Sequence, residues 1–122
     1  MSITYNIGIV GSRNFNKWDL LISEMNKITD THGQPNTIIS GGAKGADSMA
    51  EKWAKANGCE MIVHPALWNK YGKRAAYLRN KDIVRDSDML LAFPSKSGRG
   101  TQMTINLSQD KGIPIIIIDN WE

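Results

Sequence analysis

Short apolar runs alternate with amphipathic segments along this chain, and the alternation constrains the fold more than any other feature. Predominantly apolar runs at residues 5–10, 37–39, 59–64, 89–93 and 113–118 predict five strands. Segments with helical periodicity begin at residues 16 and 46 and cover residues 73–85 and 101–111. Strands that are apolar throughout and alternate with helices are typical of a parallel sheet covered on both faces. We therefore predict an α/β fold, with one Rossmann-like three-layer domain over residues 1–122.

Length and composition agree with a single soluble domain. The chain has 122 residues, of which 41% are hydrophobic and 22% charged, as in ordinary globular proteins. The net charge of +3 favours phosphate-bearing ligands, but it is small for a protein that binds nucleic acid. The single cysteine, Cys59, excludes an internal disulfide and a cysteine-rich zinc site.

Neither a leader sequence nor a membrane segment is expected. Residues 1–6 lack a basic stretch followed by an apolar run, and the apolar run at residues 113–118 is far too short to span a bilayer. We expect a cytoplasmic protein. No histidines, cysteines and acids have the spacing of metal ligands, so we predict neither a metal nor a cofactor.

Three predicted strand-to-helix loops are rich in glycine, hydroxyl and basic residues. Glycine lets the backbone approach a phosphate closely, and the helix that follows offers unpaired N–H groups. Neither a Walker A motif nor G-x-G-x-x-G is present, which disfavours a P-loop NTPase or an ordinary dinucleotide dehydrogenase. Because the carboxyl ends of parallel strands share one edge of the sheet, we predict a phosphate-binding site there. The candidate residues are Gly11, Ser12, Arg13; Ser40, Gly41, Gly42, Lys44, Gly45; and Gly98, Arg99, Gly100, Thr101.

The predicted helix at residues 73–85 carries a further candidate, Arg79. Ala76, Arg79, Asn80 and Ile83 are spaced to share one face, and the two apolar residues indicate that this face is turned inward. A buried arginine without a partner is costly, so we expect Arg79 to meet a carboxylate or a ligand phosphate. The structural alternative is a salt bridge, for example with Asp47.

Three other residues have both a structural and a functional interpretation. Asp47 opens a predicted helix, where an acid stabilises the first turn, and it is equally well placed as a ribose ligand or a general base. His64 ends a predicted strand, yet a lone histidine beside a proline is more often an ordinary loop residue. Trp68 could stack on a base, but we expect it to pack against the edge of the domain.

Taken together, the motifs resemble the SLOG superfamily, specifically its small YspA/YpsA-related branch in bacteria and their phages. The resemblance covers nearly the whole chain. It implies a Rossmann-like fold that binds nucleotides or nucleotide-derived molecules, in a family associated with stress and antiviral conflict. It rests on Gly11-Ser12-Arg13 with Phe15; residues 40–47; Trp68 with Gly72-Lys73; Arg79-Asn80; residues 87–94; Gly100-Thr101; and residues 112–114.

A related group, the LOG phosphoribohydrolases, splits a nucleoside monophosphate into base and ribose phosphate. Its Arg-Lys pair is similar to Arg79-Asn80, and its Pro-Gly-Gly-x-Gly-Thr loop is similar to residues 94–101. In that group catalytic glutamates follow the loop, whereas Gln102, Met103 and Thr104 follow it here. An N-glycosidic cleavage needs an acid or a base. If the chain is an enzyme, Asp47 and Arg79 are the catalytic candidates.

We therefore expect a binding protein rather than an enzyme, one that senses or sequesters a cyclic nucleotide or an ADP-ribose derivative. Arg79, Lys44 and Arg99 would meet phosphates, Ser12, Ser40 and Thr101 would supply hydroxyls, and Asp47 or Asn80 would contact ribose or base. The alternatives are a nucleotide N-glycosidic hydrolase and a single-stranded nucleic-acid binder like the related DprA proteins. Modest charge and few loop aromatics count against the nucleic-acid binder. Leu78 is expected to face outward and to contribute to a homodimer.

Overall fold

The five predicted strands form one parallel sheet. A computed structural model describes residues 4–96 and 98–122, so residues 1–3 and Ser97 of the third glycine-rich loop lie outside the described residues. The strands are β1 (Asn6–Gly11), β2 (Thr37–Ser40), β3 (Glu60–Val63), β4 (Met89–Phe93) and β5 (Ile115–Ile117). Their order is β3-β2-β1-β4-β5, and every neighbouring pair is parallel. The predicted α/β class is confirmed.

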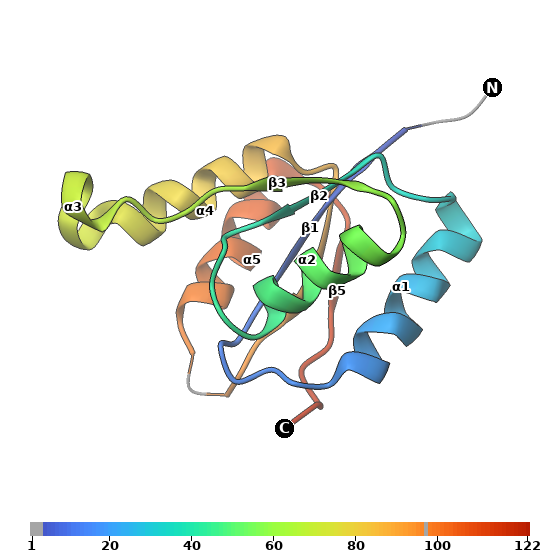
Figure 1. Cartoon of the computed structure of the whole chain (residues 1–122). Helices are drawn as coiled ribbons and strands as arrows, with labels where there is room; N and C mark the ends of the chain where they lie inside the picture. The colour runs from blue at the N-terminus through green and yellow to red at the C-terminus, as the bar shows by residue number, and fades with distance from the viewer. Residues whose placement is uncertain (1–3, 97) are drawn as a thin grey trace.

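Helices cover both faces of this sheet (Figure 1). The helices α1 (Trp18–His32) and α2 (Ala46–Ala56) lie on one face, and α4 (Ala75–Asp86) and α5 (Gly100–Lys111) lie on the other. Each face has its own core, because the sheet is apolar on both sides. In one core, residues of α1 and α2 pack against β1: Leu21, Met25, Ala50 and Trp53 over Ile7 and Ile9. In the other, residues of α4 and α5 pack against the central strands: Ile83 and Ile105 over Val10, Ile39 and Leu90.

The segment between β3 and α4 differs from the expectation. The sequence predicts a loop followed by a helix from residue 73, whereas the structure has a four-residue helix α3 (Trp68–Tyr71) and a 3-10 turn η1 (Gly72–Arg74) before α4 begins at Ala75. Four residues are too few to produce a helical period. Gly72 has a φ of +58°, a left-handed conformation that prevents α3 and α4 from forming one continuous helix.

The order of the strands reverses between β1 and β4. The chain leaves β1 toward α1 on one face and leaves β4 toward α5 on the opposite face, so the two loops separate at the carboxyl edge of the sheet, where doubly wound folds bind their ligands. Gly11 ends β1 at this point, and a Cβ there would lie 2.7 Å from the Ala46 Cβ and 2.8 Å from the Phe93 carbonyl oxygen. Glycine therefore allows β1, β4 and α2 to converge beside the opening. None of the described helices is long and apolar enough to cross a membrane.

Candidate functional site

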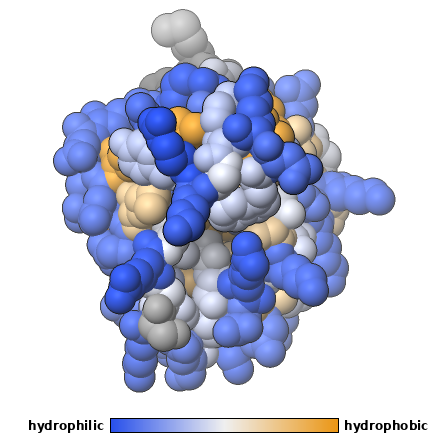
Figure 2. All heavy atoms as spheres, turned by 90° about the vertical axis from the view of Figure 1, so that its left-hand side faces the viewer, coloured by the Kyte–Doolittle hydropathy of each residue, from blue (hydrophilic) through white to orange (hydrophobic). Residues whose placement is uncertain are grey.

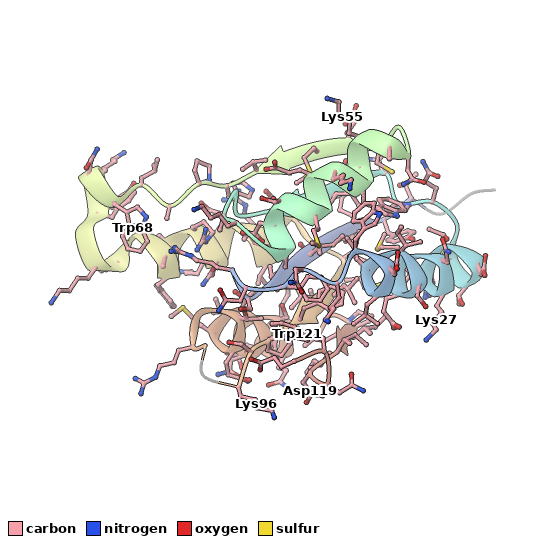
Figure 3. The ribbon with its side chains drawn as sticks, turned by 60° about the horizontal axis from the view of Figure 1, so that its bottom comes forward. Lys27, Lys55, Trp68, Lys96, Asp119 and Trp121 are labelled. Carbon is pink, nitrogen blue, oxygen red and sulfur yellow. The ribbon has the colours of Figure 1, made fainter. Side chains whose placement is uncertain are left out.

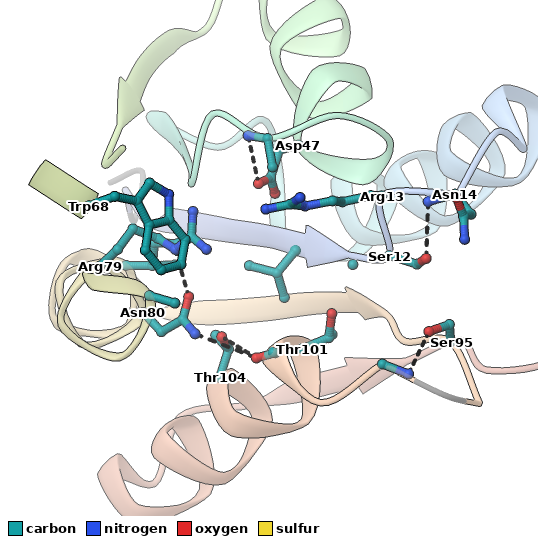
Figure 4. A pocket seen from close by; sticks show the side chains of 17 residues that line it. Ser12, Arg13, Asn14, Asp47, Trp68, Arg79, Asn80, Ser95, Thr101 and Thr104 are labelled. Carbon is teal, nitrogen blue, oxygen red and sulfur yellow. Dashed lines mark hydrogen bonds between the residues drawn. The ribbon is translucent and has the colours of Figure 1, made fainter. Parts of the chain in front are cut away.

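A pocket of about 400 Å³ opens where the loops after β1 and β4 separate (Figure 4). This volume falls in the range of small-molecule sites. Several of the predicted site residues line it: Gly11, Ser12, Arg13, Asp47, Arg79, Asn80, Gly98, Gly100 and Thr101. It is also lined by residues that the sequence analysis did not select: Val10, Asn14, Ala43, Trp68, Ala76, Ile83, Ser95 and Thr104.

The second glycine-rich loop contributes less to the pocket than the sequence analysis expects. Ser40 is completely buried at the end of β2, and its Oγ accepts a hydrogen bond from the Gly42 N–H at 3.4 Å. Gly41, Gly42 and Gly45 do not line the pocket, and Lys44 is exposed outside it. Of this segment, only Ala43 and Asp47 line the pocket, so the structure does not bring Ser40 and Lys44 to the other candidate residues.

Arg99 is also placed differently. It lines a neighbouring groove between α4 and α5, together with Tyr77, Lys96 and Gln102, and does not line the pocket. Arg99 immediately precedes α5 and is exposed. Gly98 and Gly100, its neighbours in the chain, do line the pocket. The loop thus faces the site with its backbone rather than with its arginine.

Arg79 reaches the pocket from α4 and is held by two neutral acceptors. Its Nη1 donates to the Gly41 carbonyl at 3.0 Å, and its Nε donates to Asn80 Oδ1 at 2.8 Å. The salt bridge with Asp47, the structural alternative in the sequence analysis, is not formed: no carboxylate lies within 4.0 Å of Arg79 in the described part of the chain. A Cβ on Gly41 would lie 2.6 Å from Nη1, so this glycine leaves the space for the guanidinium.

Asn80 orients Arg79 from the same helix. Only 4% of Asn80 is exposed, and its Nδ2 donates to the Gly100 carbonyl at 3.5 Å and lies 3.6 Å from Met103 Sδ. Its Oδ1 accepts the bond from Arg79. Both ends of the amide are thus engaged inside the protein, and Asn80 links the guanidinium to the start of α5. A contact of Asn80 with ribose or base, as the sequence analysis expects, would require these bonds to change.

Asp47 supplies the one carboxylate of the described lining. It lies in the first turn of α2, 7% exposed, and its Oδ2 accepts a hydrogen bond from the Ala43 N–H at 3.1 Å. Burial raises the pKa of this carboxyl, and the Ala43 N–H and the charge of Arg79 oppose that rise. A buried carboxyl with a raised pKa can hold or transfer a proton. Asp47 thus lies both in the first turn of α2 and in the lining of the pocket.

Two arginines face this single carboxylate. Burial lowers the pKa of Arg79, Asp47 raises it, and the nearby charge of Arg13 lowers it again. Arg13 is exposed, and its side chain extends toward Asp47 in Figure 4. The two guanidinium groups repel each other, and Asp47 neutralises one of them at most. An anion that enters between them would relieve this repulsion, as expected of an arginine-lined phosphate site.

The remaining wall is made of backbone and hydroxyl groups. Gly100 and Thr101 begin α5, where the N–H groups of the first turn have no partner within the helix. Thr104 Oγ1 donates to the Gly100 carbonyl at 3.3 Å, and the Gly98 N–H donates to Ser95 Oγ at 2.9 Å. These bonds shape the loop. Sequence reasoning missed Ser95 and Thr104, although both lie within four residues of the selected glycines.

Trp68 corrects another expectation. It lines the pocket and is 52% exposed, so it does not pack into the edge of the domain. His64 does not line the pocket, and its Nε2 lies 2.6 Å from Asp86 Oδ2 in a structural pair. Leu78 is half-buried rather than outward-facing, and its neighbour Tyr77 is the exposed residue.

No group of three or more histidine, cysteine or acidic residues in the described part of the chain could hold a metal ion. The pocket instead presents N–H, hydroxyl and guanidinium donors around one carboxylate. Such a donor set suits an anionic, oxygen-rich ligand.

Comparisons with known proteins identify the family of this chain and one relative. A family model described as "YspA, cpYpsA-related SLOG family" matches residues 6–71. The chain is also 36% identical over 105 residues to a protein described as "Gene 61 protein" of Mycobacterium phage D29, with 81% of each chain covered. No solved structure matches the chain significantly. The family match includes the loops after β1 and β2, while Arg79 and the loop after β4 lie beyond it.

Proposed function

This chain belongs to the YspA, cpYpsA-related SLOG family, and on that basis we propose that its pocket binds the phosphate of a nucleotide-derived small molecule. The family itself indicates a small, nucleotide-related, Rossmann-like protein. The observation that carries the proposal is the convergence of Arg13 and Arg79 on a pocket whose described lining contains one carboxylate, Asp47. Two cations around one anion favour an anionic ligand.

The phosphate is held between the two arginines and the start of α5. Arg79 uses Nε and Nη1 within the protein, and a guanidinium has five N–H donors, so donors remain for a phosphate oxygen. The N–H groups at Gly100 and Thr101 add the positive end of the α5 dipole. Asp47 is suited to accept a hydrogen bond from a ribose hydroxyl.

The biological role that fits such a pocket is sensing or sequestering a nucleotide signal. The ligand class is a cyclic nucleotide or an ADP-ribose derivative. Residues 1–122 form the single domain that binds it. Among the described residues that line the pocket, no acidic residue follows Thr101. The glutamates that catalyse hydrolysis in the LOG group therefore have no counterpart there. The relative in a mycobacterial phage supports a role in the cytoplasm of a bacterial cell, whether the gene is carried by the phage or the host.

The proposal is tested by identifying what the protein carries. The natively purified protein is denatured, and the released molecules are identified by mass spectrometry and then titrated back by calorimetry. We expect an intact nucleotide whose affinity falls about 10- to 150-fold in Arg79→Met, because charged hydrogen bonds contribute about 1.5–3 kcal/mol. Arg85→Met is the matched control: Arg85 lies on the same helix but is exposed and bonded to Asp82 and Asp86.

Two results would contradict phosphate binding. One is the absence of any nucleotide, both in the released material and in a thermal-shift screen of nucleotides. The other is a ligand that binds Arg79→Met and Arg85→Met equally well.

The second candidate function is hydrolysis of an N-glycosidic bond, and the burial and raised pKa of Asp47 favour it. A carboxyl of this kind can protonate a leaving base or activate water. The test is a time course of free base released from 5′-nucleoside monophosphates. Turnover that is lost in Asp47→Asn while binding is retained would establish the hydrolase, and intact nucleotide after prolonged incubation would favour the binding protein.

We also propose a homodimer. The supporting observation is the edge strand β3, where Ile62 and Val63 are 39% and 40% exposed. Edge strands with exposed apolar side chains tend to be covered by another chain. Sedimentation equilibrium should give twice the chain mass, with a shift toward the monomer in Ile62→Lys. A monomer at all concentrations would rule the dimer out.

A further inference from the structure

We propose that Trp68 forms a nucleobase subsite of the pocket, stacking its indole on the aromatic base of the ligand. This inference rests on the proposed function, because it assigns the base of the molecule whose phosphate Arg13 and Arg79 hold. It extends that function by assigning the aromatic base of the ligand to Trp68, next to the phosphate-binding Arg79.

The first observation is the exposure of the indole. Trp68 is 52% exposed, whereas Trp53 and Trp121 are buried in the core that includes α2. Trp68 is also the one aromatic residue among the described residues that line the pocket. Leaving so large an apolar surface in water is unfavourable, and a flat base that covers it would remove that cost.

The second observation is the arrangement of the lining residues. Figure 4 shows Trp68 beside Arg79 and Asn80 at one end of the pocket, with Ser12, Asn14 and Ser95 toward the opposite end. Ala76 and Ile83, on α4, supply further apolar lining. Hydroxyl groups and the start of α5 suit phosphate and ribose oxygens, and an indole suits a base. The two chemistries are therefore present in one pocket and come from different elements.

The third observation concerns the segment that carries the indole. The four-residue α3 packs chiefly against η1 and α4, and it projects from the end of the molecule (Figures 1 and 3). Its neighbours Leu67 and Tyr71 are also exposed, at 48% and 41%. Figure 2 shows this end to be mostly hydrophilic, with only scattered hydrophobic side chains. A broad apolar docking surface is thus not what exposes Trp68.

The size of the effect follows from stacking energies. Stacking of one base on an aromatic side chain corresponds to a loss of affinity of about 5- to 150-fold when the ring is removed. We expect that loss in Trp68→Leu for a nucleotide and no change beyond about twofold for ribose 5-phosphate, which has no base. Trp68→Phe keeps an aromatic face and should retain most of the affinity of the wild type.

The experiment is calorimetric titration of the full chain with the four 5′-nucleoside monophosphates and with ribose 5-phosphate. The variants are Trp68→Leu, Trp68→Phe, Arg79→Met and, as the matched control, Tyr71→Leu. Tyr71 lies on the same short helix and is exposed, but does not line the pocket. A loss confined to the base-bearing probes in Trp68→Leu, absent from Tyr71→Leu, supports the subsite. Circular dichroism confirms that each variant folds.

The outcomes separate this inference from the function on which it rests. If Arg79→Met loses every probe while Trp68→Leu binds all of them normally, phosphate binding stands and the base subsite is wrong. If Trp68→Leu weakens ribose 5-phosphate as much as the nucleotides, Trp68 supports the fold rather than the base. If the wild type binds no probe and the native protein neither releases a nucleotide nor is stabilised by one in the thermal-shift screen, the proposed function fails and the subsite fails with it. A change of oligomeric state in Trp68→Leu, without loss of base selectivity, would assign the indole to a protein interface.

Discussion

Arg79 is positioned by residues from three different parts of the chain. The Gly41 carbonyl follows β2, Asn80 lies beside Arg79 on α4, and Asp47 acts on its charge from α2 without touching it. None of these relationships is visible in the spacing of residues along α4. The sequence indicates that a buried arginine needs partners, and the choice among partners depends on how β2, α2 and α4 come together.

Substitution of Gly41 tests this arrangement directly. The Cβ of Gly41→Ala would lie 2.6 Å from Arg79 Nη1, and the guanidinium must move because it is the more flexible of the two. We expect ligand affinity to fall about tenfold, the value of one hydrogen bond to a charged group, while the melting temperature changes little. Calorimetry and thermal unfolding measure the two effects.

The contrasting variant is Gly58→Ala, after α2 and outside the pocket. Gly58 has a φ of +67° with open space around it, so alanine should reduce stability by about 1 kcal/mol without changing affinity. Wild-type affinity in Gly41→Ala would show that Arg79 does not contribute to binding.

Asp47 should make stability depend on pH. Burial raises the pKa of its carboxyl above the ordinary value of 3.8. Between that value and the raised one, the folded protein keeps a proton that the unfolded chain has lost, so stability falls as pH rises through this window. Relative to Asp47→Asn, the free energy of unfolding of the wild type should therefore decrease from about pH 4 upward and then level off. Urea denaturation at several pH values measures the difference, and a rise with pH would contradict the assignment.

At the scale of elements, α4 and α5 are joined through one lysine. Lys111, the last residue of α5, donates from Nζ to the carbonyls of Val84, Arg85 and Ser87, each at 2.9 Å. These carbonyls lie at the C-terminus of α4, where a positive charge is favourable. The helix that carries Arg79 is thus fixed at its far end by the helix whose start lines the pocket.

Removal of this charge should loosen the pair of helices. We expect Lys111→Met to lower the free energy of unfolding by about 1–2 kcal/mol, measured by urea denaturation. Lys55→Met is the control, because Lys55 also lies in the last turn of a helix, α2, and is exposed. Its substitution should cost no more than about 0.5 kcal/mol. Equal effects would mean that the bonds from Lys111 do not couple α4 to α5.

At the scale of the whole molecule, the C-terminal segment supports both loops of the switch point. Trp121 packs edge-on against Phe15 with ring centroids 5.2 Å apart, and Phe15 stacks on Phe93 at 4.2 Å. Trp121 Nε1 also donates to the Pro94 carbonyl at 2.8 Å. Figure 3 shows Trp121 against the body of the protein, far from Trp68. One indole thus contacts the loop after β1 and the start of the loop after β4.

Loss of this indole should affect stability and binding together. Trp121→Ala is expected to lower the free energy of unfolding by about 3 kcal/mol, as for other large-to-small core substitutions. Trp121→Phe keeps most of the packing and loses only the bond to Pro94, so about 1 kcal/mol is expected. Urea denaturation measures the free energy of unfolding of both variants, and calorimetric titration of the folded protein measures their ligand affinity. Unchanged affinity in a folded Trp121→Ala would show that the two loops hold their shape without the C-terminal segment.

The sequence by itself determined the class of the fold and the edge of the sheet at which the candidate site lies. Apolar runs between amphipathic segments specify parallel strands covered by helices, and that arrangement places the loops after the strands at one edge. These are local patterns, repeated along the chain, and the family resemblance depends on the same glycine-rich segments. Arg79 could be selected for a similar reason, because the cost of burying a charge is a property of the residue and its helix face.

Only the tertiary structure decided which side chains reach the pocket. The order β3-β2-β1-β4-β5 puts β1 beside β4, so the loops after these two strands line the pocket, whereas Ser40 is buried and Lys44 is left outside. Arg99 turns to a neighbouring groove, and Trp68 is presented on a helix too short to have a period. Each of these outcomes depends on contacts between segments far apart in the sequence, which no local pattern of residues encodes.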